Sequence, residues 1–136
     1  MPQIFGFHHV SLPASDPDRS SDWYERVFGF ERLLIEEEED RVTMIMLEHP
    51  RGMRLCLHLV QSLDAEWSGQ GKVAAVLSFR VASHTDLLQW DERLTKLGVE
   101  HSGPREAHLG WALDVTDPSG LRIQLHTAEP VSADNA

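Results

Sequence analysis

The chain has 136 residues, of which 41% are hydrophobic, and it carries 22 Asp and Glu against 12 Lys and Arg, giving a formal net charge of -10. Its size suits one domain with a buried core, while its negative charge suits a cationic ligand and disfavours nucleic acid and anionic membranes, which bind clusters of Lys and Arg. No apolar run approaches the roughly 18 to 20 residues that span a bilayer, a single cysteine excludes an internal disulfide, and no secretion signal is evident, so we expect a cytoplasmic protein.

The first half of the chain predicts four strands and one helix. Residues 4–14 alternate well enough for a strand, and Ser15 or Asp16 is placed to cap a helix with Pro17 in its first turn. Gly29 is the expected C-terminal stop of this helix, because glycine adopts the left-handed conformation at least cost. The remaining strands of this half are predicted at residues 30–35, 42–47 and 53–60.

Turns are predicted between these strands. The acidic run at residues 36–40 is interpreted as a solvated hairpin turn, with attraction of a cationic ligand as a second reading. Residues 49–52 and 117–120 each contain Pro and Gly, which favour a turn.

The second half of the chain predicts the same order of elements. Residues 73–81 predict a strand, Ser83 is placed to cap a helix, and Gly98 closes that helix. Three further strands are predicted at about residues 99–102, 110–115 and 121–127. We therefore expect one domain over residues 1–128, made of a first repeat at about 4–62, a linker at about 63–72 and a second repeat at about 73–127, followed by a flexible tail at 129–136.

The two halves also repeat each other in sequence. Residues 49–58 match residues 117–126 at an offset of 68, with Pro, Gly, Arg, Leu and His at the same places. The segments at 23–26 and 9–12 match residues 90–93 and 76–79 at an offset of 67. Segments of different types that recur in one order at nearly one offset indicate a duplication.

The repeat predicts a ligand site between the halves, because clefts between repeated units are preferred binding sites. Side chains alternate faces along a strand, so Cys56 shares a face with His58, and Gln124 with His126. The repeat pairs Cys56 with Gln124, and it pairs His9 with Val76. A pseudo-twofold cleft would bring these four residues together at its centre.

Two segments resemble a known family. One segment consists of residues 9–16 and the Trp and Phe positions of 23–30, and the other is the closing strand at 117–124. Both resemble the vicinal-oxygen-chelate superfamily of glyoxalases, fosfomycin and bleomycin resistance proteins and ring-cleaving dioxygenases. The resemblance extends from Phe7 to His126. It implies an α+β fold of two tandem βαβββ units with pseudo-twofold symmetry, whose curved mixed sheets form a cleft, and it implies a homodimer.

In metal-using members of that family, four equivalent positions supply His, Glu or Gln to a divalent ion that acts as a Lewis acid. The resemblance places His9, Cys56, Val76 and Gln124 in those positions. Valine has no donor atom, and a glutamine oxygen is weaker than a carboxylate for a hard cation, so His9, Cys56 and Gln124 form a poor cage for Mg²⁺, Mn²⁺ or Fe²⁺. We expect no metal cofactor, the alternative being one divalent ion of Mn, Fe, Ni or Zn.

Other aromatic side chains are weaker candidates. His58 and His126 either join His9 in a three-histidine site for Zn²⁺ or Ni²⁺, act as general acid or base in a metal-free pocket, or form part of the cleft wall. Trp111 lies in an alternating strand and is a candidate to stack on a ligand in the cleft. His8 is expected to point away from His9. Exposed positions are expected for His49, His84, His101 and His108.

Three functions remain open from the sequence. The first is metal-independent binding or sequestration of a small molecule, which requires only a shaped cleft with a few polar groups. The second is a divalent-metal-dependent lyase, isomerase or dioxygenase that acts on a small oxygenated substrate. The third is a metal-free enzyme that uses the cleft histidines. The incomplete ligand set favours the first, because a metal enzyme requires three or four converging donors.

Overall fold

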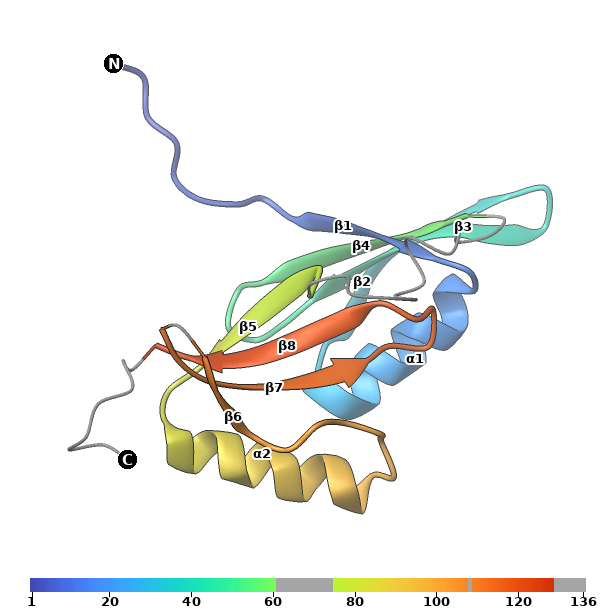
Figure 1. Cartoon of the computed structure of the whole chain (residues 1–136). Helices are drawn as coiled ribbons and strands as arrows, with labels where there is room; N and C mark the ends of the chain where they lie inside the picture. The colour runs from blue at the N-terminus through green and yellow to red at the C-terminus, as the bar shows by residue number, and fades with distance from the viewer. Residues whose placement is uncertain (61–74, 108, 129–136) are drawn as a thin grey trace. The chain divides into compact units, whose positions relative to one another are not determined.

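A computed structural model describes residues 1–60, 75–107 and 109–128, and divides the chain into two compact units, Met1–Asp64 and Ala65–Ala136. The described residues of each unit form one helix and one four-stranded mixed sheet, and these elements follow the order strand, helix, strand, strand, strand (Figure 1). The predicted α+β class and the tandem βαβββ units are therefore confirmed.

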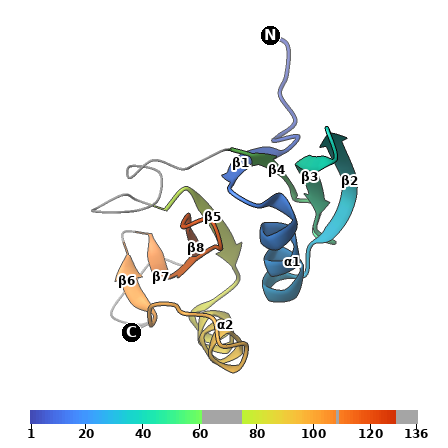
Figure 2. The same ribbon diagram turned by 90° about the vertical axis from the view of Figure 1, so that its right-hand side faces the viewer.

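Unit 1 forms a sheet with the strand order β1-β4-β3-β2. The first strand pairs in parallel with the last, and the other neighbours are antiparallel. Figure 2 shows α1 lying against one face of this sheet. The elements are β1 (Val10–Ala14), α1 (Pro17–Phe28), β2 (Glu31–Glu38), β3 (Arg41–Glu48) and β4 (Arg54–Leu59).

Unit 2 repeats this plan with the strand order β5-β8-β7-β6. Again the first and last strands are parallel, and α2 packs on the two central strands of the sheet. The elements are β5 (Leu77–Val81), α2 (His84–Lys96), β6 (Arg105–Ala107), β7 (Gly110–Thr116) and β8 (Arg122–Thr127).

The helix ends lie where the sequence predicts them. The Asp16 side chain accepts a hydrogen bond from the Arg19 N–H at 3.2 Å and caps α1, and the Ser83 hydroxyl caps α2 in the same way. Gly29 follows α1 with φ 81°, and Gly98 follows α2 with φ 71°. Both helices therefore begin and end by local chemistry that the sequence encodes.

The repeated sequence segments form the same turn in both units. The His49 N–H donates to the Met53 carbonyl oxygen at 2.8 Å, and the Asp117 N–H donates to the Leu121 carbonyl oxygen at 2.8 Å. The glycines of the two turns, Gly52 and Gly120, have φ of 91° and 90°. The offset of 68 residues in the sequence thus corresponds to one shared backbone geometry.

Three predicted strand boundaries are wrong. The strand predicted at 4–14 begins only at Val10, which pairs with Leu55, and β4 itself begins just one residue earlier, at Arg54. The strand predicted at 99–102 is a single bridge between His101 and Val115, and regular pairing begins after Pro104, which has no N–H to donate. The strand predicted at 73–81 begins at Leu77. The predicted linker at 63–72 and the tail at 129–136 lie outside the described residues.

The core of each unit lies between its helix and its sheet. In unit 1, Tyr24 and Val27 of α1 are fully buried over Ile45 and Leu57 of the central strands. Each such side chain contributes about 1.5 to 3 kcal/mol by leaving water. No helix in the described part of the chain is long and apolar enough to cross a membrane.

His101 is nearly buried, contrary to its predicted exposure. Its Nδ1 donates to the Val99 carbonyl oxygen at 2.7 Å and its Nε2 donates to the Asp91 carboxylate at 2.6 Å. Burial lowers the pKa of His101, but these two hydrogen bonds and the Asp91 charge outweigh burial and raise its pKa above the ordinary value. Because both ring nitrogens face acceptors, the protonated ring is the form that satisfies the site.

We expect His101 to stabilise the fold more at low pH than at high pH. A raised folded-state pKa adds stability that is complete below the unfolded pKa of about 6.5 and is lost as pH rises through the folded pKa. In urea unfolding, His101→Gln should lower the free energy of unfolding by about 1 kcal/mol more at about pH 6 than at about pH 9. Asp91→Asn should remove most of this pH dependence, and an equal loss at both pH values would contradict the assignment.

The hairpin turn predicted at residues 36–40 is confirmed only for Glu39 and Asp40, because the first three acidic residues pair with β3 as the end of β2. Glu39 and Asp40 join β2 to β3 with φ of 51° and 63°, and these positive angles at both turn positions favour Asn-Gly over the native pair. We therefore expect Glu39→Asn with Asp40→Gly to stabilise unit 1 by about 0.5 to 1 kcal/mol in urea unfolding. Glu37→Gln removes a charge from the same run without changing the turn, and it should reproduce little of this gain.

Candidate functional site

Each sheet has an open face, which we define as the face opposite the helix of its own unit. Leu55 and Leu57 of β4 and Ile123 and Leu125 of β8 are buried on the helix side. The alternate residues therefore lie on the open face. The open face of unit 1 includes Ser11, Met44, Met46, Arg54, Cys56 and His58, and that of unit 2 includes Ser78, Arg80, Arg105, Asp114, Arg122, Gln124 and His126.

In unit 1, the structure places two predicted site residues side by side on β4. Cys56 lies opposite Ser11 of β1, and the Nε2 atom of the exposed His58 lies 3.3 Å from the Ser11 hydroxyl. His9 precedes β1 and is exposed. Its Nδ1 lies 2.9 Å from that of His8, so these two rings do not point apart as predicted, because both lie outside the strand.

The Cys56 thiol is held in an apolar and sulfur-rich position. The residue is 3% exposed, and its thiol donates a hydrogen bond to the Met44 sulfur at 3.8 Å. Burial raises the pKa of the Cys56 thiol, and the Glu36 carboxylate raises it further. Since a thiolate is the form that binds a metal or attacks an electrophile, this position holds the inactive, protonated form.

In unit 2, Gln124 and His126 lie on the open face of β8. The Ser78 hydroxyl of β5 donates to Gln124 Oε1 at 2.9 Å. His126 donates from Nδ1 to the Thr127 carbonyl oxygen at 2.5 Å, which leaves its Nε2 as the outward ring nitrogen. Val76 precedes β5 and donates only its backbone N–H, to the Arg122 carbonyl oxygen at 3.0 Å.

The same parallel pairing fixes the site residues of both units. Ser11 lies opposite Cys56 in unit 1, and Ser78 lies opposite Gln124 in unit 2. These pairs are related by the offsets found in the sequence. Positions that the repeat makes equivalent therefore have equivalent neighbours in the two units. That the pairs from the two units meet in one cleft stays a prediction.

A hollow of about 550 Å³ lies on unit 2 beside two predicted site residues. Its volume falls within the range of small-molecule sites. Its lining is Arg105, Glu106, Ala107, Leu109, Gln124 and His126.

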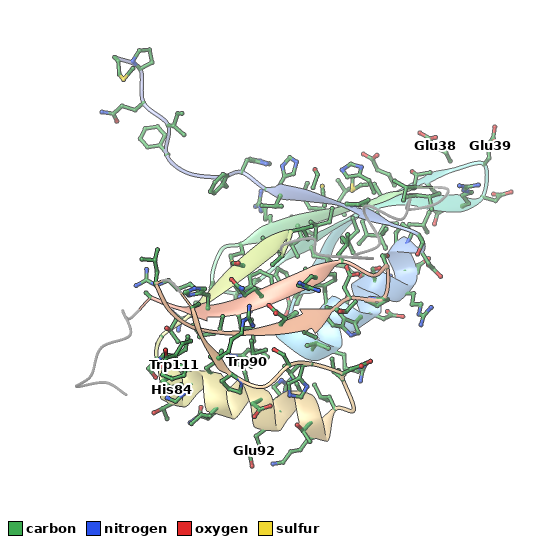
Figure 3. All side chains as sticks on the ribbon, viewed as in Figure 1. Glu38, Glu39, His84, Trp90, Glu92 and Trp111 are labelled. Carbon is green, nitrogen blue, oxygen red and sulfur yellow. The ribbon has the colours of Figure 1, made fainter. Side chains whose placement is uncertain are left out.

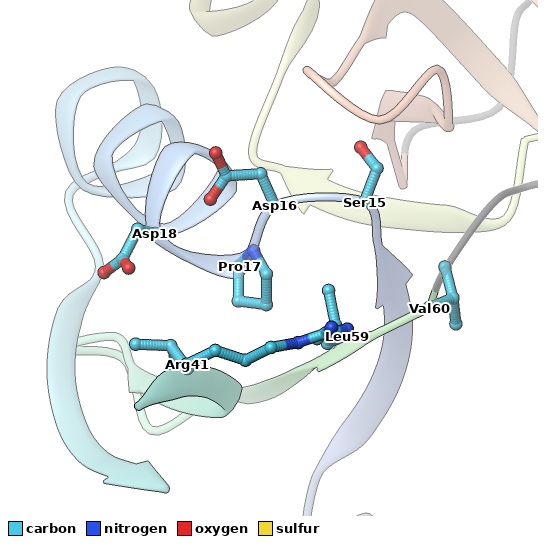
Figure 4. Close-up of a pocket in the computed structure, with 8 residues that line it drawn as sticks. Ser15, Asp16, Pro17, Asp18, Arg41, Leu59 and Val60 are labelled. Carbon is cyan, nitrogen blue, oxygen red and sulfur yellow. The ribbon is translucent and has the colours of Figure 1, made fainter. Parts of the chain in front are cut away.

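A second hollow, of about 440 Å³, lies on unit 1 at the start of α1. Figure 4 shows Arg41 extending beneath Pro17, with Asp16 just before α1 and Asp18 in its first turn. None of the predicted site residues lines this hollow, so we do not assign the ligand site to it.

Trp111 does not lie on the open face of its sheet, contrary to its candidacy as a ligand-stacking residue. Its ring stacks on His84 of α2, with centroids 4.4 Å apart and planes inclined by 28° (Figure 3). Trp111 alternates with Ala112, which pairs with His126, and therefore lies on the helix side of β7. Its partner His84 is the first residue of α2 rather than an exposed loop residue.

The donor set does not fit the divalent metal that the resemblance implies. Val76 has no donor, the Cys56 thiol is buried, and Gln124 offers a neutral amide oxygen that is weaker than a carboxylate for a hard cation. Of the four positions, His9 alone carries the imidazole that metal-using members of the family use as a ligand. Within either unit, no three His, Cys, Asp or Glu side chains among the described residues lie close enough to hold a metal ion. We therefore derive no step that passes through a metal.

Sequence reasoning missed the charged residues that surround Gln124 and His126. Arg80 lies opposite His126 on β5, and Arg105 of β6 forms an ion pair with Asp114 of β7 at 2.9 Å. The available signal was the alternation of Ser78 and Arg80 with buried Phe79 and Val81, which assigns the two polar residues to one face.

The fold defines a class of small tandem βαβββ proteins, and sequence comparison identifies the family. A sequence model of the "Glyoxalase/Bleomycin resistance protein/Dioxygenase superfamily" matches residues 6–125. The chain therefore belongs to the glyoxalase/bleomycin resistance protein/dioxygenase superfamily, as the sequence resemblance predicts.

Solved structures show the same fold. A glyoxylase/bleomycin resistance protein/dioxygenase domain from Frankia sp. EAN1pec superposes with a TM-score of 0.75 at 25% identity, covering 93% of this chain and all of that one. The fosfomycin resistance protein FosX from Listeria monocytogenes has a TM-score of 0.71 at 18% identity, with 98% of both chains covered. Lactoylglutathione lyase from Agrobacterium tumefaciens has a TM-score of 0.69 at 18% identity, covering 93% of this chain and 96% of that one.

One curated relative is a longer protein. The Bacillus subtilis (strain 168) protein named "Putative ring-cleaving dioxygenase MhqA" is 25% identical over 132 residues. The match covers 93% of this chain but only 42% of MhqA. The chain thus spans about two fifths of the length of this relative.

We expect the Cys56 thiol to resist modification in the folded protein. Its raised pKa leaves little thiolate at neutral pH, and its burial excludes a bulky reagent. With the thiol reagent DTNB, the native chain should react at least about a hundredfold more slowly than the same chain in urea. Complete labelling of the native protein at the denatured rate would contradict the buried, protonated state.

Proposed function

We propose that this protein binds a small molecule without a metal ion, as a binding or sequestration protein, through the open faces of its two sheets. The donor set at the four family positions carries the proposal. One position holds valine, one holds a buried thiol, and one holds an amide whose oxygen is neutral and therefore a weak ligand for a hard cation. Such a set lacks the converging anionic or imidazole donors that hold a divalent ion.

The groups on unit 2 suit a ligand better than a metal. Gln124 and His126 line a hollow large enough for a small molecule, and both present polar atoms there. Polar groups of this kind orient a ligand in a binding pocket.

We also propose that the chain forms a homodimer, as its family resemblance implies.

A metal-dependent lyase, isomerase or dioxygenase is the second candidate. It is favoured by the names of relatives: FosX from Listeria monocytogenes was solved in complex with Mn(II), and MhqA is named for ring cleavage. A metal-free enzyme is the third candidate. Because Nδ1 of His126 donates to the Thr127 carbonyl oxygen, its Nε2 is the ring nitrogen available to act as a general base.

Metal analysis separates these candidates. We expect the purified chain, incubated with Mn²⁺, Fe²⁺, Ni²⁺ or Zn²⁺ and then desalted, to retain well under one ion per chain by mass spectrometry. The His9→Ala variant should retain the same amount. One ion per chain that is lost in His9→Ala would overturn the proposal.

Small-molecule binding itself is then tested by thermal shift against a compound library in the presence of EDTA.

The double variant Val76→His with Gln124→Glu serves as the positive control. It restores an imidazole and a carboxylate at two family positions, so we expect it to retain Mn²⁺ or Zn²⁺ at least about tenfold more tightly than the native chain. If the variant gains no affinity although it stays folded, the four positions do not converge, and the assignment of the site to them fails.

A further inference from the structure

Two arginines lie on either side of His126 on the open face of unit 2. The strand registers place Arg80 opposite His126, His126 opposite Ala112, and Ala112 opposite Arg105. Residues directly opposite on neighbouring strands point to the same face, and neighbouring strands lie about 4.8 Å apart. The two arginines therefore begin about 14 Å apart, with the histidine and a small alanine between them.

The open face of unit 2 carries more positive than negative side chains. Asp114 balances Arg105 through an ion pair of 2.9 Å. The guanidinium group of Arg80 is exposed and forms no ion pair or side-chain hydrogen bond with any residue in the described ranges. Arg122 adds a further positive charge on the same face, and Glu106 stands at the rim of the hollow, opposite Trp111. Among the described residues, this face is thus positive in a chain whose net charge is -10.

Gln124 contributes hydrogen-bond donors to the same face. Its Oε1 accepts the Ser78 hydroxyl at 2.9 Å, so its Nε2 keeps two N–H groups for other partners. Gln124 lies two residues before His126 on β8, on the same face, and it lines the hollow. In metal-using members of the family, this position supplies an electron pair to a cation. In this chain, Gln124 offers N–H donors at the same position.

We propose that the open face of unit 2 binds an anionic group of the ligand, a carboxylate or a phosphate, between Arg80 and the Gln124 amide. This inference rests on the proposed metal-independent binding and names the chemistry of its ligand. Guanidinium and amide N–H groups both donate to anionic oxygens, and charge-assisted bonds of this type are stronger than neutral ones. The positive charge of this face favours an anionic group, although the overall negative charge suggests a cationic ligand, because binding depends on the groups in contact.

Titration of the full chain with two simple anions tests this proposal. Sodium phosphate and sodium succinate are added to ¹⁵N-labelled protein in separate experiments, each against sodium chloride at matched ionic strength. We expect saturable shifts of amide signals in β5 and β8 with at least one of the two anions. Saturation with phosphate alone identifies a phosphoryl group, and saturation with succinate alone identifies a carboxylate.

Three variants locate the bound anion. Arg80→Gln should weaken binding at least about fivefold, and Gln124→Glu should weaken it about tenfold, because it replaces a donor with a negative charge. Lys96→Gln removes the same charge as Arg80→Gln from an exposed site on α2, and should change affinity less than about twofold. Dispersed amide spectra verify that each variant is folded.

The proposal fails if neither anion gives saturable shifts, or if Lys96→Gln weakens binding as much as Arg80→Gln. Its failure is distinguishable from failure of the proposed function. If neutral or cationic compounds stabilise the metal-free chain while phosphate and succinate do not bind, metal-independent binding stands and the anionic ligand does not. A stoichiometric metal held by His9 would instead remove the proposed function.

Discussion

The parallel pairing of the first and last strands in each unit is the constraint on which the site depends. This pairing joins β1 to β4 and β5 to β8, and it sets which residues are neighbours across the open faces. A shift by one residue would exchange the open and helix faces of a strand, so the buried leucines hold the register. In unit 2, Leu125 is 1% exposed on the helix side, and this burial keeps Gln124 and His126 on the other side.

The same backbone therefore carries different chemistry in the two units. At equivalent positions, unit 1 places a thiol against a methionine sulfur, whereas unit 2 places an amide against a hydroxyl. The Cys56 thiol is buried, whereas Gln124 lines a hollow. Duplication thus conserves the geometry of a position, and side-chain replacement decides whether it serves packing or binding.

Much of this arrangement was predictable from the sequence because local chemistry encodes it. Asp16, Gly29 and the two Pro-Gly turns mark element boundaries, and the repeat identifies equivalent residues without any coordinates. The strand at 105–107 was not predictable in this way, because its pairing depends on β7 rather than on its own short sequence. Trp111 was misassigned for a related reason: alternation shows that neighbours face opposite ways, but not which face meets the helix.

The charge on the open face of unit 2 differs in sign from the overall charge for a physical reason. Many of the acidic residues lie on exposed surfaces such as the β2–β3 hairpin, where Glu38 and Glu39 extend into solvent (Figure 3). Solvent and salt screen such charges beyond about 8 to 10 Å, so they influence the approach of a ligand more than its binding. Contact is governed instead by the few groups within hydrogen-bond reach, and on unit 2 these are the arginine, amide and imidazole side chains that the register brings to one face. A protein of negative net charge can therefore present a positive binding surface.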